Sequence, residues 1–208
     1  KNAMPHADSS LVPSTVQSKS EFWIHVHDQL SALLDGQRDW ITNLANAASL
    51  IYTSLLAFPP FGDGPSSVNW CGFYIHSKFF PAASLVLTTA PTTPNPAPRL
   101  LLAPFCGKPA CQFIGVAPGK ARGVCADAFL SAQTRLVPNV HAYPGHIACD
   151  GATQSELVCP LVLPRADASD VVLGVLDLDC LALGGFDEDD RVGLEKIARL
   201  VVDACDYL

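Results

Sequence analysis

The sequence predicts a single α+β domain in which helices pack on a sheet of meandering strands. Two helical patterns open the chain, short strand-like runs joined by turns follow, and a last helical pattern closes it. A chain of 208 residues, 49% of them hydrophobic, is long enough to bury a core of its own. Layers of helices on a sheet bury the apolar faces of both kinds of element.

Two amphipathic helices are expected ahead of the first strand. Ser20 stands where an N-cap is expected, and apolar residues then recur at spacings of three and four as far as position 34. A second apolar stripe over 40–56 stops before a pair of prolines. Residues 1–19 have no apolar periodicity, so we expect a mobile tail there and a domain over 20–208.

The middle of the chain predicts a series of short strands. The expected strands are 68–75, 85–87, 100–104, 111–114, 134–137, 156–163 and 171–178. The last two flank a polar turn, which is typical of an antiparallel hairpin. Residues near 88–98 are rich in Pro and Thr, and because proline cannot join a central ladder we expect an insertion there.

Two more helices are expected in the second half of the chain. The first covers 124–132, directly after a glycine. The second begins at a run of acidic residues over 187–190, where the helix dipole favours negative charge. Val192 and Leu194 are among the residues expected to face the core from this helix.

Charge and hydropathy exclude two classes of partner. A net charge of −7 disfavours nucleic-acid binding, which depends on clustered Lys and Arg. No apolar run approaches the ~18 to 20 residues that a membrane span needs. No secretory signal follows Met4, so we expect a cytoplasmic protein.

The eight cysteines fall into groups by their surroundings. Four lie in apolar strand or helix patterns, which is typical of small buried hydrophobes: Cys71, Cys159, Cys180 and Cys205. Cys111, Cys125 and Cys149 lie beside Gly, Pro and His at loop-like joins between elements. Two thiols brought together can convert a sulfenic acid on one into a disulfide, so these three are the candidates for redox chemistry.

His146 and the cysteine spacing bear on two further kinds of chemistry, tuning of a thiol and metal binding. His146 precedes Cys149 by three residues and can lower the pKa of that thiol or orient it, or it can bond backbone as an ordinary loop histidine. Cys106 and Cys111, with Cys125 further along, lack the paired short spacings of zinc sites. We therefore expect no metal site.

Three carboxylates are positioned to converge. Asp177 and Asp179 alternate along one strand and so face the same side of the sheet, and Glu156 begins the neighbouring strand. If they line a cavity near Cys149, they raise one another's pKa values, can supply a proton and attract an ammonium group. The alternative is a solvated edge with ordinary surface acids.

Trp70 and Tyr74 are four residues apart on a strand and share a face. They either wall a pocket or fill the core, and the pattern alone favours the core. Gly72, Gly107 and Gly123 are interpreted as isolated turn glycines, because no phosphate-cradling loop surrounds them.

Six short motifs are spread in order over most of residues 20–208. They are Val68-Asn-Trp-Cys-Gly-Phe-Tyr74, Gly107-Lys-Pro-Ala-Cys111, Gly123-Val-Cys125, His141-Ala-Tyr-Pro-Gly-His-Ile-Ala-Cys-Asp150, Ser155-Glu156 and Gly174-Val-Leu-Asp-Leu-Asp179. In these motifs the chain resembles the free methionine-(R)-sulfoxide reductases, which are GAF-domain enzymes. The resemblance implies a six-stranded antiparallel sheet flanked by helices around a small pocket, in a homodimer whose first helices contribute to the interface.

The resemblance also implies roles for the thiols. Cys149 would attack the sulfoxide sulfur and become a sulfenic acid, which Cys111 would convert to a disulfide. Thioredoxin or a thioredoxin-like dithiol would reduce that disulfide, without metal or organic cofactor. Cys125 would have an ancillary role, in disulfide exchange or in lining the pocket. Cys106 stands where the family pattern has glutamine, and it can join the exchange or be inert.

The remaining matches imply how substrate would be held. Glu156, Asp177 and Asp179 would be the pocket carboxylates, and Trp70 and Tyr74 the aromatic wall around the sulfoxide end. A carboxyl can protonate the sulfoxide oxygen, and the others can bind a free α-ammonium, which methionine inside a peptide lacks. The expected substrate is free methionine-(R)-sulfoxide. The alternative is a non-catalytic GAF module that senses a small amino-acid-like ligand.

Overall fold

The computed structural model describes residues 12–62, 64–80, 97–147, 149–166 and 168–207. The helices are α1 (Lys19–Leu34), α2 (Trp40–Ala57), α3 (Val124–Ser131) and α4 (Glu188–Asp203). The strands are β1 (Val68–His76), β2 (Arg99–Gly107), β3 (Phe113–Gly115), β4 (Arg135–Val137), β5 (Ser155–Leu163) and β6 (Val171–Cys180).

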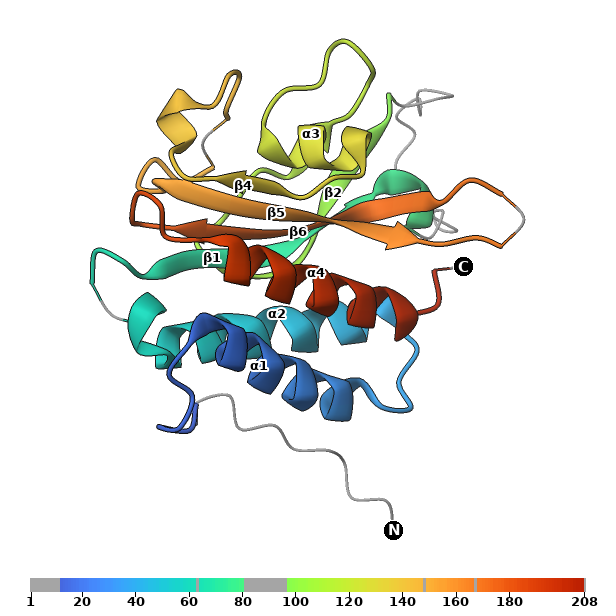
Figure 1. The fold of residues 1–208 in the computed structure, drawn as a ribbon. Coiled ribbons are helices and arrows are strands. Elements are labelled where there is room, and N and C mark those ends of the chain that lie inside the picture. The colour runs from blue at the N-terminus through green and yellow to red at the C-terminus, as the bar shows by residue number, and fades with distance from the viewer. Residues whose placement is uncertain (1–11, 63, 81–96, 148, 167, 208) are drawn as a thin grey trace.

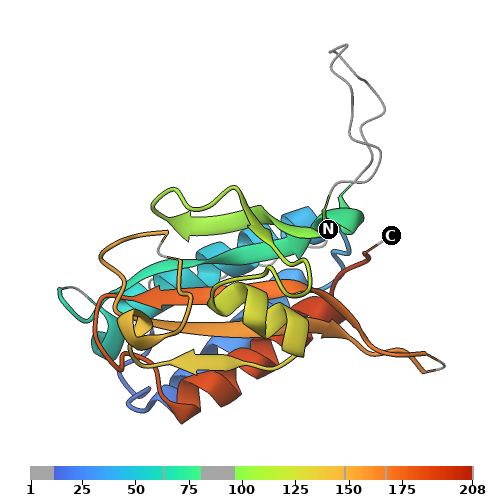
Figure 2. The same ribbon diagram turned by 90° about the horizontal axis from the view of Figure 1, so that it is seen from above.

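The strands form one antiparallel sheet in the order β3-β2-β1-β6-β5-β4. Helices α1, α2 and α4 lie on one side of this sheet, and α3 lies on the other side (Figures 1 and 2). The predicted α+β class and six-stranded antiparallel sheet are confirmed, as is the hairpin of β5 and β6. Within the described residues, no helix combines the length and the apolar character that crossing a bilayer requires.

Helix α1 begins two residues earlier than predicted. Ser18, not Ser20, is the N-cap: its side chain accepts a hydrogen bond from the Glu21 amide, and the Glu21 carboxylate accepts one from the Ser18 amide. The sequence Ser-x-x-Glu is a capping box, which satisfies amides that the first turn leaves unpaired. The prediction of Ser20 was wrong because it ignored this reciprocal spacing.

Several predictions concern residues outside the described part of the chain. These are most of the tail (1–11), the strand at 85–87 and most of the Pro/Thr-rich insertion (88–96). Val12 and Val16 are described, and they pack against the core beneath α1, α2 and α4.

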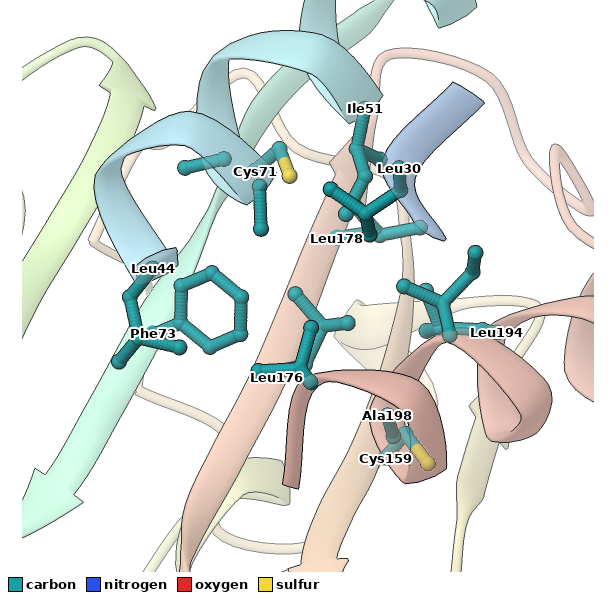
Figure 3. Close-up of a cluster of buried hydrophobic side chains, with 14 of the residues drawn as sticks. Leu30, Leu44, Ile51, Cys71, Phe73, Cys159, Leu176, Leu178, Leu194 and Ala198 are labelled. Atoms are coloured by element: carbon teal, nitrogen blue, oxygen red, sulfur yellow. The ribbon is translucent and has the colours of Figure 1, made fainter. Parts of the chain in front are cut away.

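The main core lies between the sheet and these three helices. Alternate side chains of β1 and β6, including Phe73, Leu176 and Leu178, point toward the helices and meet Leu30 and Leu194 (Figure 3). Full burial of one such side chain contributes roughly 1.5–3 kcal/mol. Because successive side chains of a strand point to opposite faces, the residues between these core positions point to the α3 side of the sheet.

The core face of α4 differs from the prediction in its second turn. Val192 is 40% exposed, whereas Leu194 and Ile197 are buried. Gly193 takes the inward position instead, because a Cβ there would lie 2.1 Å from Cγ of Trp23. The close approach of α1 requires a residue without a side chain at that point.

The four cysteines predicted to be structural are all buried in the helix-side core. They are Cys71, Cys159, Cys180 and Cys205. Cys106 packs against the same core and pairs across the sheet with Cys71.

Candidate active site

A cavity of about 290 Å³ lies on the α3 side of the sheet. This size is close to the lower end of the ~300 to 1,000 Å³ range of ligand pockets. All eight site residues predicted from the sequence line it: Trp70, Tyr74, Cys111, Cys125, Cys149, Glu156, Asp177 and Asp179. Strands β1, β5 and β6, the start of α3 and two loops each contribute, so the fold brings together residues far apart in the sequence.

The strand register explains why the polar and aromatic side chains meet. Trp70 on β1 pairs with Asp179 on β6, which in turn pairs with Glu156 on β5. Paired residues on neighbouring strands share a face, so these three form a row across the sheet. Two residues along β6, Asp177 lies opposite Gly72 and extends the same face. The convergence predicted for the carboxylates is thus confirmed.

Cys111 and Cys149 face one another across the cavity mouth, with their sulfurs 2.7 Å apart. Cys111 lies on the loop after β2 and Cys149 on the loop before β5, and both are free thiols. A disulfide needs about 2.05 Å between sulfurs, so little movement separates this arrangement from a bond. Burial and the neighbouring Cys111 thiol raise the pKa of Cys149 to about 12, which keeps it protonated near neutral pH.

Cys125 is buried in the first turn of α3 and contacts two of the acids. Its thiol donates to Oδ2 of Asp177, 3.3 Å away, and lies 3.8 Å from Oε1 of Glu156. Burial and the negative charge of Asp177 raise the pKa of this thiol well above its usual value. The sulfur and one oxygen of each acid lie within 4.8 Å of one another, a donor set that can hold a thiophilic divalent ion.

The three acids are buried rather than solvated. Burial, followed by the charge of Glu156, raises the pKa values of Asp177 and Asp179 well above the usual carboxyl range. Oδ1 of Asp177 is buried without a hydrogen-bond partner among the described residues. The alternative of a solvated edge is therefore wrong, and the pocket holds carboxyls that are protonated at higher pH than ordinary ones.

His146 contacts an acid of the cavity. Its Nε2 lies 3.4 Å from Oε2 of Glu156, and both side chains are largely buried. Burial raises the pKa of Glu156, and the contact with His146 opposes that shift. The loop that carries Cys149 is thereby tied to β5. The prediction that His146 lowers the pKa of Cys149 was wrong, because that pKa is raised and the contact of His146 is with Glu156.

Trp70 and Tyr74 both wall the cavity and hold a loop. Their rings stack with centroids 5.9 Å apart, and both side chains are almost fully buried. The Trp70 indole donates to the carbonyl of Lys108 over 3.2 Å, and the Tyr74 hydroxyl donates to the carbonyl of Cys111 over 3.0 Å. The two aromatic residues therefore fix the backbone of the loop that carries Cys111.

Gly72 lies within β1, so its interpretation as a turn glycine is wrong. A Cβ there would lie 2.4 Å from Cβ of Phe105 and 2.5 Å from the Trp70 ring. Phe105 also stacks on Trp70, with ring centroids 5.6 Å apart. The glycine makes room for the aromatic wall.

Cationic groups at the cavity were missed by the sequence reasoning. Lys120 and Arg122 line it just before α3. Gly123, the N-cap of α3, has φ +91° and no side chain that caps the helix. Unpaired amides at a helix start favour an anion. The signal in the sequence was the Lys-x-Arg-Gly stretch directly before a predicted helix.

Comparison with known proteins identifies the family. No family model matches the chain. The free methionine-R-sulfoxide reductase of Saccharomyces cerevisiae is 36% identical over 200 residues, which cover 96% of this chain and 94% of the yeast protein. A solved GAF domain matches with a TM-score of 0.73 at 37% identity, covering 99% of both chains.

A second solved structure is the free methionine-R-sulfoxide reductase of Neisseria meningitidis in complex with its substrate. It matches with a TM-score of 0.65 at 31% identity and covers 90% of each chain. The yeast match spans nearly the whole chain at an identity that establishes common family membership. The chain belongs to the free methionine-R-sulfoxide reductase family and has its GAF fold.

Proposed function

We propose that this protein reduces free methionine-(R)-sulfoxide to methionine, with Cys149 as nucleophile and Cys111 as resolving thiol. The observation that carries the proposal is the 2.7 Å approach of their two sulfurs at the mouth of a carboxyl-lined cavity. A ligand-sensing module does not require two apposed thiols, whereas a thiol reductase does.

In the first step Sγ of Cys149 attacks the sulfoxide sulfur while Asp177 donates a hydrogen bond to the sulfoxide oxygen. The S–O bond of the substrate breaks as an S–O bond to Cys149 forms. The oxygen takes the proton of Asp177, and the thiol proton of Cys149 replaces it on the carboxyl. Methionine and a Cys149 sulfenic acid result, and the substrate sulfur gains the two electrons that Cys149 loses. The raised pKa and unpaired Oδ1 of Asp177 support its choice as donor.

In the second step the Cys111 sulfur attacks the sulfenic sulfur of Cys149. The S–S bond forms, the S–O bond breaks, and the hydroxyl leaves as water with the proton of Cys111. A dithiol reductant, thioredoxin or a thioredoxin-like protein, then exchanges with the disulfide and restores both thiols.

The charges around the cavity suit a free amino acid. Glu156 and Asp179 would bind the α-ammonium, while Arg122, Lys120 and the uncapped start of α3 would bind the α-carboxylate. Methionine sulfoxide within a peptide lacks both charges, so it should be a poor substrate. Trp70 and Tyr74 would pack against the methyl group.

We further propose a homodimer formed through α1 in a reducing compartment such as the cytoplasm. Ile24 on α1 and Val192 on α4 are 57% and 40% exposed and line the same shallow groove. Eight free cysteines suit a compartment that keeps thiols reduced.

The test measures methionine formed from the R and S epimers and from the N-acetylated R form, with dithiothreitol as reductant. Wild type should consume only the free R epimer. Cys149→Ser should be inactive, and Cys111→Ser should complete one turnover and stop with thioredoxin as reductant. An inactive wild type that still binds methionine would instead support the ligand-sensor function.

A further inference from the structure

We propose that Lys108 and Asp150 form an ionic latch that positions the loop of Cys111 against the loop of Cys149 for disulfide formation. This inference rests on the proposed function, because it assigns a role in its second step. Lys108 is not among the residues that line the cavity. Its role would be to position the resolving thiol.

The latch joins the two cysteine loops directly. Nζ of Lys108 lies 3.1 Å from Oδ2 of Asp150. Lys108 is three residues before Cys111 in its loop, and Asp150 directly follows Cys149. The ion pair therefore spans the same gap as the two sulfurs.

Asp150 is held from several directions. Its Oδ2 also accepts from Nδ2 of Asn69 over 3.3 Å, and its Oδ1 accepts from the Ala152 amide over 3.0 Å. Nδ2 of Asn69 donates to Oγ1 of Thr153 as well, over 3.1 Å. The amide of Ala152, followed by Lys108, lowers the pKa of Asp150, so it is ionised at neutral pH. These hydrogen bonds hold the Asp150 carboxylate in a fixed position for its ion pair with Lys108.

The backbone of the Lys108 loop is fixed on the opposite side. Trp70 and Tyr74 hold its carbonyls at positions 108 and 111. Gly107 has φ +122°, and a Cβ there would lie 2.6 Å from the carbonyl oxygen of Asn69. Residues of β1 therefore fix the backbone of the Lys108 loop, and the Lys108–Asp150 ion pair connects this loop to the loop of Cys149.

The pair should contribute little to global stability. Lys108 is 69% exposed, and exposed ion pairs typically contribute about 0–1 kcal/mol. A small energetic contribution can still matter for geometry, because the rate of an intramolecular reaction depends steeply on how its two groups are held. Loss of the latch should slow the resolving step without unfolding the protein.

Loss of the latch should affect the second chemical step but not the first. Sulfoxide reduction needs Cys149 and the cavity, while resolution forms the S–S bond with loss of water and needs Cys111 close to Cys149. Lys108→Met should therefore release the first methionine at the wild-type rate. It should then accumulate the Cys149 sulfenic acid.

The experiment follows one turnover in the absence of reductant by rapid quenching. Methionine release, sulfenic acid trapped by dimedone, and the Cys111–Cys149 disulfide are measured for wild type, Lys108→Met, Lys108→Arg and the surface control Lys78→Met. We expect disulfide formation to slow about fivefold to tenfold in Lys108→Met, as loss of positioning predicts. Lys108→Arg and Lys78→Met should behave as wild type.

A double-mutant cycle tests whether Asp150 is the residue through which Lys108 acts. In an Asp150→Asn background, which keeps the oxygen that accepts from Ala152, Lys108→Met should have little further effect on the disulfide rate. Raising the ionic strength should slow resolution in wild type but not in Lys108→Met, because salt screens exposed charges.

Hydrogen peroxide separates failure of the latch from failure of the proposed function. Peroxide oxidises Cys149 to the sulfenic acid with release of water, so resolution can be timed without methionine sulfoxide. If wild type ignores the sulfoxide but Lys108→Met still resolves slowly after peroxide, the function fails and the latch stands. Wild-type resolution in Lys108→Met, or an equal fall in both steps together with a lower melting temperature, would overturn the latch.

Discussion

Cys125 donates its thiol hydrogen to Asp177 at the base of the cavity, with Sγ and Oδ2 3.3 Å apart. The Cys125 thiol is buried and its hydrogen is bonded to this carboxyl, whereas Cys149 is exposed beside Cys111, so another sulfur can reach Cys149 but not Cys125. This geometry favours the pocket-lining role for Cys125 over a role in disulfide exchange.

We therefore expect Cys125→Ser to keep activity within a few-fold of wild type, because a hydroxyl can make the same hydrogen bond. Cys125→Ala should lose roughly tenfold, since an unpaired buried acceptor costs about 1–3 kcal/mol. Steady-state kinetics with dithiothreitol measure both variants. Peptide mapping of the oxidised wild type should find Cys125 as a free thiol; a disulfide to Cys111 or Cys149 would contradict the prediction.

Replacing Asp177 should stabilise the protein while impairing the reaction. Burial raises the pKa of this carboxyl, so the folded state keeps its proton at a pH where the unfolded state has lost it. Below the ordinary pKa of about 4 both states are protonated, and the substitution should change nothing; above it, wild-type stability should fall relative to Asp177→Asn.

At pH 7 we expect Asp177→Asn to raise the free energy of unfolding by roughly 1–3 kcal/mol and to lower turnover by a hundredfold or so. Urea denaturation at pH 3.5 and pH 7 measures the first effect, with the exposed Asp28→Asn as control. Equal stabilities of wild type and Asp177→Asn at both pH values would show that burial does not perturb this acid.

Gly193→Ala should destabilise the packing of α1 on α4. Alanine is favoured in a helix by about 1 kcal/mol, but its Cβ would lie 2.1 Å from Cγ of Trp23. The indole cannot easily retreat, because it donates to Asp190 over 2.9 Å. Overpacking of this kind costs about 1–3 kcal/mol, so we expect a net loss of stability.

Thermal unfolding of Gly193→Ala measures this balance. Gly115→Ala is the matched control, since a Cβ there has no neighbour within 4 Å. It should unfold within about 0.5 kcal/mol of wild type. A Gly193→Ala protein more stable than wild type would mean that helix propensity outweighs the steric contact.

The proposed dimer depends on the exposed apolar side chains of α1 and α4. Ile24→Glu places a charge where Ile24 is 57% exposed beside Val192, and it should shift the protein to monomers because a buried unpaired charge opposes association. Sedimentation equilibrium measures the effect. Leu183→Glu, at a residue 61% exposed before α4, should leave the dimer intact. A monomeric wild type would refute the interface.

Local patterns predicted most of the fold. The two apolar runs of β5 and β6, the polar turn between them and the acidic start of α4 depend on neighbours along the chain, so they can be recognised without coordinates. The start of α1 was misplaced because two serines compete and only one has glutamate three residues later. The interpretation of Gly72 was wrong because the residue that requires a glycine there, Phe105, lies on another strand and is far away in the sequence.

The residues of the candidate site were predicted from family motifs and strand periodicity. The family motifs named all eight predicted lining residues, and strand periodicity explained why Asp177 and Asp179 share a face. The contact of His146 with Glu156 and the bond from Lys108 to Asp150 join loops whose approach only the tertiary fold determines. No spacing rule along the sequence gives such pairs.

The sheet also separates the cysteines into two sets, one on each of its faces. Cys111, Cys125 and Cys149 line the cavity on one face, whereas Cys106 packs with Cys71 and the other three on the helix side. Thiol exchange requires one sulfur to reach another, and a layer of paired backbone stands between the two sets. In the proposed reaction the Cys111–Cys149 disulfide would therefore form without exchange with the buried thiols, and Cys106 would add no competing bond.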